Sequence, residues 1–480
     1  MLKHSLVPLL LGALLSSGCA ETAHPAPGQC DALPTTMKER IDPFVTESMR
    51  TGHIPGLSLV VLQGGQPVCI KSYGLANVEK NQPMTPNTLV SIGSTTKAMT
   101  ALALMQQVEA GAVALDAPVT RYLPWFRTAD GLQDQILVKH LLSHTSGLPN
   151  GMAWDGDHDD EALERMVRSL AEVKLHFPPG QQEAYSNDGL AVAGLIVQTV
   201  ARKPFEQHMA DSVFEPLGMS RTFMGAVPEQ EQDVVQGYTW TRGQLHTMAP
   251  PWSRAHVPAG SATHTTAEDV SRYFSALLAR GEATGGRVLS AQGIERMWQP
   301  AVMTHNGPSA NGLGWVISEE SGRKRVSHGG NTITSSSSFN LIPSEGLAVG
   351  VLSNLNTPVT ELVGTGVVAL LSGEEPTKPV SNDRAPSTFV PDTSVWRNYV
   401  GTYDTAIGPL IVSVEAGHLW LTIEAARPPV RGELEAYGDN DFVERDELGL
   451  LEGMSVKFKP SPDGGMLLLL NDQPVGGRVP

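Results

Sequence analysis

The sequence has very little cysteine and only one long apolar run. Its 480 residues include three cysteines, and no two of them form a Cys-x-x-Cys pair. Zinc ribbons and thioredoxin-type sites need such pairs, and disulfide scaffolds need more cysteines, so all three are excluded. Cys30 and Cys69 can pair in an oxidising compartment or remain separate thiols, and the sequence leaves both open. The apolar run lies near the N-terminus and is too short to span a membrane, and no longer run follows it.

Positive charge is also scarce. Lys and Arg total 34 against 50 Asp and Glu, which gives a formal net charge of −16. A chain with this balance repels phosphate backbones, so binding to nucleic acid through charge is excluded. Hydrophobic residues make up 41% of the chain, and the 48 glycines and 35 prolines stay below the level of a low-complexity protein. Length and composition together predict a globular protein of two or three domains.

The first residues have the features of an export signal. Lys3 precedes the apolar run Leu6 to Leu15, and small residues then lead to Cys19. This order resembles a bacterial lipoprotein signal, in which the cysteine is lipidated and becomes the new N-terminus. The alternative is an ordinary cleaved signal peptide, because Ser16 stands where lipoprotein signals usually have Leu. We expect residues 1–19 to form the signal and 20–32 a tether, in a protein exported to the cell envelope or periplasm and anchored in the membrane through Cys19.

Residues 33–373 alternate between helical and strand-like segments. Periodicity and end signals predict helices over 37–49, 95–109, 138–142, 161–170, 188–201, 267–278 and 359–371. Strands are predicted over 57–62, 67–73, 313–316, 324–326, 337–341 and 347–352, and the first two are joined by a hairpin. Strands near both ends with helices between them predict one α/β domain with a helical insertion.

The composition changes after residue 373. Residues 374–393 carry four prolines among Ser, Thr and charged residues, which is typical of a linker. Short strand-like runs follow over 399–403, 410–414, 418–423, 442–444 and 466–470. They predict a small all-β barrel or sandwich over residues 394–480. Residue types that carry chemistry do not gather there, so we expect the reaction in the first domain.

Ser94 and Lys97 stand three residues apart at the start of the helix predicted over 95–109. At that spacing the two side chains lie on one helix face, so the amine can reach the hydroxyl. The helix dipole also favours an anion that develops at the serine. The pair is therefore a candidate for an activated serine nucleophile. A second Ser-x-x-Lys, Ser321 to Lys324, lies in a charged turn with glycine, and we interpret it as structural.

Two further groups carry polar side chains that such a nucleophile can use. Tyr185 and Asn187 form the only Tyr-x-Asn in the chain. A phenol near an ammonium ionises more easily and can act as a general base, and an Asn amide can hold an ester or amide group. A turn tyrosine with an Asn helix cap is the alternative.

The other group is His328, Gly329, Gly330 and Asn331. Paired glycines let the backbone approach a ligand, and the amide of Asn331 can complete an oxyanion hole. The alternative is a glycine turn with an incidental histidine.

The three groups in this order resemble the serine β-lactamase and penicillin-recognising hydrolase family, on its class C side. There Ser-x-x-Lys is followed by Tyr-x-Asn, and then by Lys-Thr-Gly or a His-x-Gly variant on an edge strand. Residues 140–149 and 259–270 also match the family, and the resemblance covers about residues 35–373. It implies a β-lactamase/transpeptidase-like fold, in which an antiparallel sheet is flanked by helices and accompanied by a helical subdomain.

The resemblance also implies a role for each matching residue. Ser94 attacks a carbonyl and forms an acyl-enzyme, while Lys97 and Tyr185 share its proton. The backbone amides of Ser94 and Asn331 stabilise the oxyanion, and water then releases the acid. The residues implied in substrate binding are Asn187, His328, Gly329, Gly330 and Asn331. No metal or organic cofactor is implied.

Two patterns resemble metal sites and are set aside. Asp155, Asp157 and Asp159 alternate as in a calcium loop, but the position that needs glycine holds another aspartate. His140 and His144 have helical spacing without the Glu of a His-Glu-x-x-His zinc motif. The absence of Gly-x-Ser-x-Gly argues against an α/β-hydrolase.

His328 departs from the lysine that most of the family carries at this position. Lysine supplies a permanent charge for a substrate carboxylate, whereas histidine is mostly neutral above its ordinary pKa of about 6.5. Family branches with histidine there include D-aminopeptidase-like enzymes, esterases and other peptidases. The sequence therefore predicts a secreted or lipid-anchored serine hydrolase whose partner is a small-molecule or peptide substrate: an ester, an amide or a D-amino-acid peptide. The alternatives are β-lactamase or DD-carboxypeptidase activity, and a non-catalytic envelope binding or sensing protein of the same fold.

Overall fold

The structure is a computed structural model of the chain. It describes residues 30–153, 156–241, 243–249, 252–304, 308–379, 387–405, 409–423, 426–427, 429–446, 454–461, 464–470 and 473–479. The predicted export signal, the tether up to residue 29, Cys19 and Asp155 lie outside the described residues.

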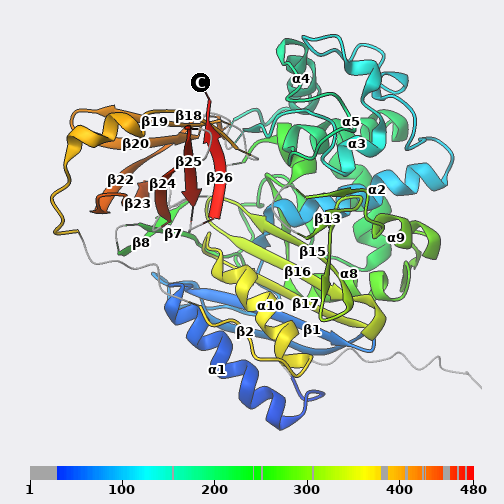
Figure 1. Cartoon of the computed structure of the whole chain (residues 1–480). Coiled ribbons are helices and arrows are strands. Elements are labelled where there is room, and N and C mark those ends of the chain that lie inside the picture. The colour runs from blue at the N-terminus through cyan, green and yellow to red at the C-terminus, as the bar shows by residue number, and fades with distance from the viewer. Residues whose placement is uncertain are drawn as a thin grey trace, which may run out of the picture.

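A nine-stranded sheet lies at the centre of the first domain (Figure 1). Its order is β12-β13-β14-β15-β16-β17-β1-β2-β3, and each neighbouring pair is antiparallel. The strands are β1 Gly56–Gln63, β2 Gln66–Asn77, β3 Gln82–Pro83, β12 Val302–Met303, β13 Ala310–Asn311, β14 Val316–Glu320, β15 Arg323–Asn331, β16 Ser336–Ile342 and β17 Leu347–Ser353. The predicted hairpin of the first two strands is present. Strands from the two ends of the domain meet where β17 pairs with β1.

Helices cover both faces of this sheet. On one face lie α1 Thr35–Thr51 and α10 Val359–Leu371, and on the other lie α2 Thr96–Glu109, α8 Ala267–Leu278 and α9 Ala291–Met297 (Figure 1). Strand β1 shows why the sheet needs both layers. Its Leu57 and Leu59 pack in the core with α1 and α10, whereas Val60 and Leu62 pack in the core with α2 and α8. A strand that is buried on both faces is expected to be continuously apolar, as this one is.

A helical region lies beside α2 (Figure 1). Its helices are α3 Val138–Leu142, α4 Ala162–Ser169, α5 Asn187–Ala201, α6 Phe205–Met209 and α7 Glu215–Leu217, with a π-helical segment over Ala210–Phe214. Short strands complete the domain: β4 Val90–Ser91, β5 Met152–Ala153, β6 Phe223–Met224, β7 Gly237–Thr241, β8 Gln244–Met248, β9 Thr263–Thr265, β10 Glu282–Ala283 and β11 Gly286–Arg287. The 3₁₀ segment η6, Arg254–Ala259, connects this region to the sheet domain.

The strand predicted over 313–316 is wrong. These residues form a bend, and the strand β14 begins only at Val316. The reason is Gly314, whose φ of +74° turns the chain against helix α2, where a Cβ would lie 2.6 Å from that of Ala101. Leu313 and Trp315 are apolar because they are buried in the helical core, and a strand is not needed to explain them.

The C-terminal part is a closed eight-stranded barrel, which decides between the barrel and the sandwich of the sequence analysis. Its strands are β18 Gly401–Thr405, β19 Leu410–Glu415, β20 His418–Ile423, β22 Val430–Gly438, β23 Asp441–Asp446, β24 Ser455–Pro460, β25 Met466–Leu470 and β26 Gln473–Arg478. Aromatic side chains such as Tyr403, Phe442 and Phe458 fill its interior. Strand β21, Ala426–Arg427, leaves the barrel and pairs in parallel with β5 of the first domain.

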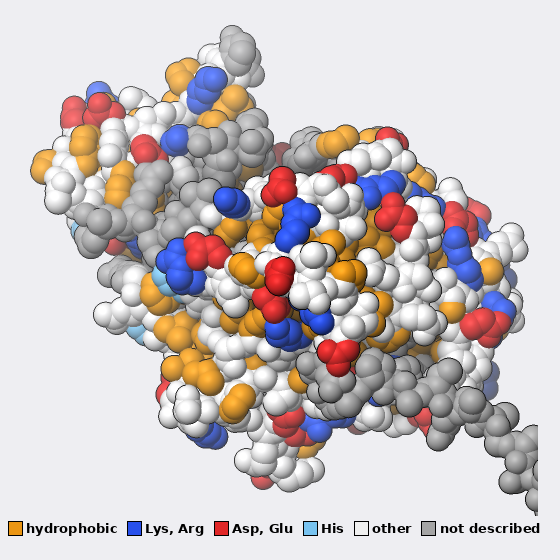
Figure 2. Space-filling view, turned by 90° about the horizontal axis from the view of Figure 1, so that it is seen from below, with side chains coloured by type: hydrophobic (Ala, Val, Ile, Leu, Met, Phe, Trp, Pro, Cys, Tyr) orange, Lys and Arg blue, Asp and Glu red, His pale blue; other side chains and the backbone are white. Residues whose placement is uncertain are grey.

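Three features bear on the surroundings of the protein. Cys30 and Cys69 form a disulfide, so the paired alternative of the sequence analysis applies. Within the described residues, no helix combines the length and apolarity needed to cross a membrane. On the face that Figure 2 shows, basic and acidic side chains are interspersed and do not gather into a large field of one sign.

Candidate active site

Ser94 lies in the tight turn between strand β4 and helix α2. The turn is a 3₁₀ segment, Gly93–Thr95, and Gly93 has a φ of +52°. A Cβ at Gly93 would lie 2.5 Å from the carbonyl oxygen of Asn331, so only glycine allows this approach to β15. Every residue from Thr88 to Met105 is buried except Ser94. The fold therefore presents this one hydroxyl at the surface of an otherwise closed segment.

Lys97 lies one turn into the helix with its amine at the serine. Its Nζ is 2.8 Å from Ser94 Oγ and donates to the carbonyl oxygen of Ala259 at 2.7 Å. The side chain is completely buried, and this burial holds the pKa of the Lys97 amine well below its ordinary value. A neutral amine next to a hydroxyl can accept its proton.

Tyr185 completes the contact around the nucleophile. Its phenol interacts with the Ser94 hydroxyl, and Lys97 Nζ lies 4.8 Å from the centre of its ring. Burial raises the pKa of the Tyr185 phenol above its ordinary value. The expectation that this phenol ionises more easily is wrong, because burial disfavours both the phenolate of Tyr185 and the ammonium of Lys97. Lys97 is therefore the base of the pair, and Tyr185 remains a proton donor.

His328 to Asn331 form the second half of β15. Strand β14 pairs with β15 only as far as Ser327, so the segment 328–331 is free on that side although β15 itself lies inside the sheet. The resemblance implied an edge strand, and this is true only of that half. Its glycines allow a close approach, since a Cβ at Gly330 would lie 2.1 Å from the carbonyl oxygen of Ile92. Gly329 is exposed, and a Cβ there would lie 3.6 Å from Glu361 Oε2.

Two histidines flank the Tyr185 ring. The ring of His144 lies 4.5 Å from it and that of His328 6.5 Å, between centroids. Burial, with Lys97 nearby, lowers the pKa of His328 to about 4, and burial lowers the pKa of His144 well below its ordinary value. Both imidazoles are therefore neutral at neutral pH, as the sequence analysis expected for His328.

A pocket of about 380 Å³ opens onto these groups. The residues that line it are His144, Asn150, Tyr185, Asn311, Trp315, Val316, His328, Gly329 and Asn331, and none of them is Lys or Arg. Asn187 is buried behind it at the start of α5, where its backbone N–H donates to Asn150 Oδ1 at 3.3 Å. Among the described residues, the Nδ2 of Asn187 has no hydrogen-bond partner. The site thus holds one unused amide donor.

Sequence reasoning missed the serines that position the nucleophile. Ser335 donates to the carbonyl oxygen of Ser91 and Ser337 to that of Ile92, both at 2.7 Å. Ser336 donates to Asn331 Oδ1 at 2.7 Å. Consecutive hydroxyls of β16 and its approach therefore hold both the turn before Ser94 and the end of β15. The signal was available, because an unbroken run of serines in a predicted strand must find partners when it is buried.

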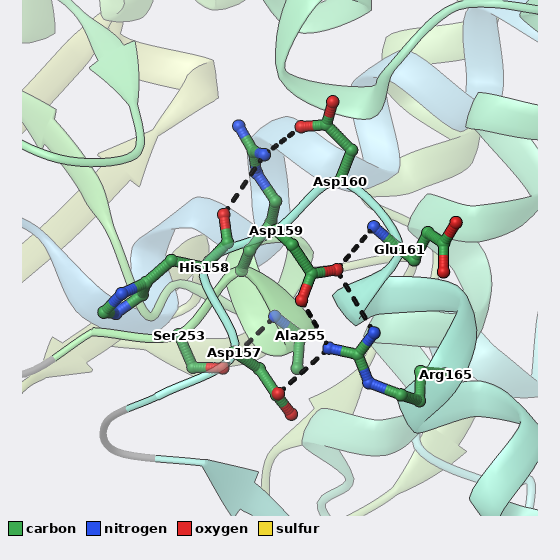
Figure 3. A network of polar contacts seen from close by, with 9 residues as sticks. Asp157, His158, Asp159, Asp160, Glu161, Arg165, Ser253 and Ala255 are labelled. Atoms are coloured by element: carbon green, nitrogen blue, oxygen red, sulfur yellow. Dashed lines mark hydrogen bonds and ion pairs between the residues drawn. The ribbon is translucent and has the colours of Figure 1, made fainter.

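The structure describes most of the residues in the two metal-like patterns of the sequence. Arg165 lies between Asp157 and Asp159, at 2.9 and 2.8 Å from their oxygens (Figure 3). His140 is on α3, whereas His144 follows the end of that helix with a φ of +58°. Within the described residues, no group of three or more His, Cys, Asp or Glu side chains is placed to hold an ion.

Comparisons with known proteins agree with this geometry. The sequence profile of the family described as Beta-lactamase matches residues 41–372, well over half of the chain. Protein flp of Staphylococcus aureus (strain N315) is 26% identical over 326 residues, which are 67% of this chain and 64% of that protein. Unguisins hydrolase ungD' of Aspergillus campestris is 29% identical over 341 residues, 68% of this chain and 62% of that one. The chain thus spans a little under two thirds of the length of these curated relatives.

The fold is also found among solved structures. The octameric penicillin-binding protein homologue from Pyrococcus abyssi is similar with a TM-score of 0.61 and 24% identity, over 90% of this chain and 98% of that one. The profile match covers Ser94, Lys97, Tyr185 and the β15 segment that the structure brings together. The chain therefore belongs to the β-lactamase family of serine hydrolases.

Proposed function

We propose that this protein is an exported hydrolase that forms an acyl-enzyme on Ser94 with neutral esters, amides or D-amino-acid peptides. The observation that carries the proposal is the contact of 2.8 Å between Ser94 Oγ and the fully buried Nζ of Lys97. A buried lysine without a described carboxylate partner is costly to the fold. Its place beside a serine hydroxyl is explained by catalysis.

The first chemical step follows from the pKa directions. Neutral Lys97 takes the proton of Ser94 Oγ as the oxygen bonds to the substrate carbonyl carbon. The backbone N–H groups of Ser94 and Asn331 receive the oxyanion that forms. The protonated phenol of Tyr185 then gives its proton to the leaving alcohol or amine as the old bond breaks, and the Lys97 ammonium returns a proton to the Tyr185 phenolate. Water then attacks the acyl-enzyme ester, Ser94 Oγ takes back its proton, and the acid is released.

The pocket favours substrates without a carboxylate. His328 is neutral because its pKa lies at about 4, and the pocket lining contains no lysine or arginine. The amide side chains that line it, Asn150, Asn311 and Asn331, are also uncharged. Neutral hydrogen bonds are about half as strong as charge-assisted ones, so a substrate carboxylate loses more hydration than it regains here.

A substrate panel tests this proposal. Short esters, D-amino-acid amides and a chromogenic cephalosporin are offered to the wild type and to His328→Lys, and intact-mass spectra report the acyl adduct. We expect the wild type to turn over an uncharged ester or amide faster than the cephalosporin, and His328→Lys to shift the ratio toward the cephalosporin. Faster turnover of the cephalosporin by the wild type would favour the β-lactamase alternative, and no adduct with any compound would favour a binding protein.

Export and anchoring through Cys19 form a second part of the proposal. The disulfide of Cys30 and Cys69 supports it, since such bonds persist in oxidising compartments. Membrane and soluble fractions of cells that express the wild type or Cys19→Ser test the anchor. We expect Cys19→Ser to leave the membrane fraction or to accumulate uncleaved, and unchanged fractionation would favour an ordinary signal peptide.

A further inference from the structure

A buried, hydrogen-bonded pair of side chains lies next to the candidate site. Asp188 Oδ1 and His256 Nε2 are 2.8 Å apart, and both side chains are nearly inaccessible, with exposed fractions of 6% and 5%. Asp188 is the residue after Asn187 in helix α5, and His256 lies in η6. Neither residue lines the pocket, so neither touches a substrate there.

On the Asp188 side, the pair holds the start of α5. Ser186 caps this helix by accepting the N–H of Gly189 at 2.9 Å, and Asn187 is its first residue. The carboxylate of Asp188 is packed against Gly151, where a Cβ would lie 2.4 Å from Oδ1. The carboxylate is therefore closely confined, and the segment that carries Tyr185 and Asn187 is fixed relative to it.

On the His256 side, the pair holds the turn that supports Lys97. The carbonyl oxygen of His256 accepts the N–H of Gly260 at 3.0 Å and that of Ser261 at 3.2 Å. Ala259, which lies between His256 and Gly260 in the chain, offers the carbonyl oxygen that accepts from Lys97 Nζ. Gly260 lies against the nucleophile turn, since a Cβ there would be 3.1 Å from the backbone nitrogen of Ser94. If His256 moves, the groups of this turn that contact Lys97 and Ser94 therefore move with it.

The far end of η6 is anchored separately. Arg254 forms ion pairs with Asp160 and with Glu206, and its backbone N–H donates to the carbonyl oxygen of Asp157 at 3.1 Å. These contacts are near the surface, where ion pairs contribute little to stability. The buried pair is the contact that fixes the end of η6 which faces the reaction.

We propose that Asp188 and His256 are positioning residues that lock the Lys97-binding turn to the segment carrying Tyr185 and Asn187. Lys97 and Tyr185 act on the same Ser94 hydroxyl but come from different elements, and their separation must be held to a fraction of an ångström for proton transfer. The pair supplies a short, buried link between those elements. This inference rests on the proposed acylation of Ser94.

The test compares Asp188→Ala with Asp188→Asn and His256→Gln in steady-state kinetics on the best ester. Asp188→Ala removes the link, so we expect kcat to fall about tenfold to a hundredfold, with KM within about twofold because neither Asp188 nor His256 lines the pocket. Asp188→Asn and His256→Gln keep a hydrogen bond between the two positions and should retain most of kcat. The double variant of Asp188→Ala and His256→Ala should be no slower than the slower single variant.

Asp269→Ala is the matched control. Asp269 is equally buried and pairs with Arg272 at 2.6 Å, but lies on α8 outside the pocket lining. The substitution Asp269→Ala should lower the melting temperature without lowering kcat. Wild-type kcat in a folded Asp188→Ala, a change in KM alone, or an equal loss in Asp269→Ala would overturn the inference.

Crystal structures of the wild type and Asp188→Ala provide a readout that does not need activity. We expect the contacts of Lys97 with Ala259 and of Tyr185 with Ser94 to lengthen in the variant, and unchanged contacts would overturn the inference. A wild type that is never acylated on Ser94 would instead overturn the proposed function, and the structures would still decide on the positioning role.

Discussion

The chain contains two Ser-x-x-Lys sequences, and the structure places them in opposite surroundings. Ser94 and Lys97 begin a helix of the core, where the lysine is fully buried and its amine is 2.8 Å from the hydroxyl. Ser321 is in the turn between β14 and β15 with a φ of +50°, and Lys324 Nζ instead binds Glu295 at 2.7 Å. The same four-residue pattern is thus a candidate catalytic pair in one place and a hairpin turn in the other.

The difference teaches that burial gives the motif its chemistry. An exposed lysine keeps its proton and forms ordinary ion pairs, whereas burial makes the neutral amine the favoured form. The serine must also be held, and Ser335 and Ser337 hold the turn before Ser94 from a neighbouring strand. The comparison therefore predicts that equal substitutions in the two motifs have very unequal effects.

The largest effect is expected for the serines. Ser94→Ala should abolish labelling by a general serine-hydrolase probe, because the nucleophilic oxygen is removed, whereas Ser321→Ala should label like the wild type. Labelling is measured by intact mass with peptide mapping. Retained labelling of a folded Ser94→Ala would show that another residue is the nucleophile.

The lysines should differ almost as much. Lys97→Ala removes the base, so we expect the labelling rate to fall by several orders of magnitude. Lys324→Ala removes a half-exposed ion pair with Glu295, which contributes about 0–1 kcal/mol to stability and nothing to the reaction. The labelling rates of both variants are measured from a time course with the serine-hydrolase probe. A similar loss in both variants would point to a general structural role of lysine and against a base.

Much of this contrast could be predicted from the sequence. Helix α2 and the hairpin of β1 and β2 have strong periodicity and clear end signals, and they form where expected. The order of the three motifs indicated one site, although they lie on η1, the start of α5 and β15. Sequence alone could not show how deeply each group is buried, and for that reason the expected pKa direction of Tyr185 was wrong.

The parts that could not be predicted have a common physical cause. Barrel strand β22 was missed because its inward positions include Gly432 and Ala436, which give a weak apolar pattern between charged neighbours. The pair of Asp188 and His256 was missed because 68 residues separate its members and only the fold brings them together. Long-range polar contacts leave no local periodicity to detect.

The pH dependence should report the buried lysine. Lys97 acts as a base only without its proton, and burial lowers its pKa well below the ordinary value. Labelling with an uncharged probe should therefore be fast above that lowered pKa, and should be lost as the pH falls through it. His328 titrates at about 4 and does not contribute near neutrality. A rate that rises only near the ordinary pKa of lysine, about 10.4, would mean that Lys97 is protonated at rest.

The smallest effect is expected for the serines that support the Ser94 motif. Ser337→Ala removes a buried hydrogen bond to Ile92, and Ser338→Ala removes one to Glu361 on the other face of the same strand. Each should cost about 1 kcal/mol of unfolding free energy. Only Ser337 touches the nucleophile turn, so only its loss should slow labelling, by less than about tenfold, since a tenfold change corresponds to about 1.4 kcal/mol. Urea unfolding and probe kinetics on both variants separate the two effects. Equal slowing by Ser338→Ala would show that overall stability, and not the support of the turn, sets the labelling rate.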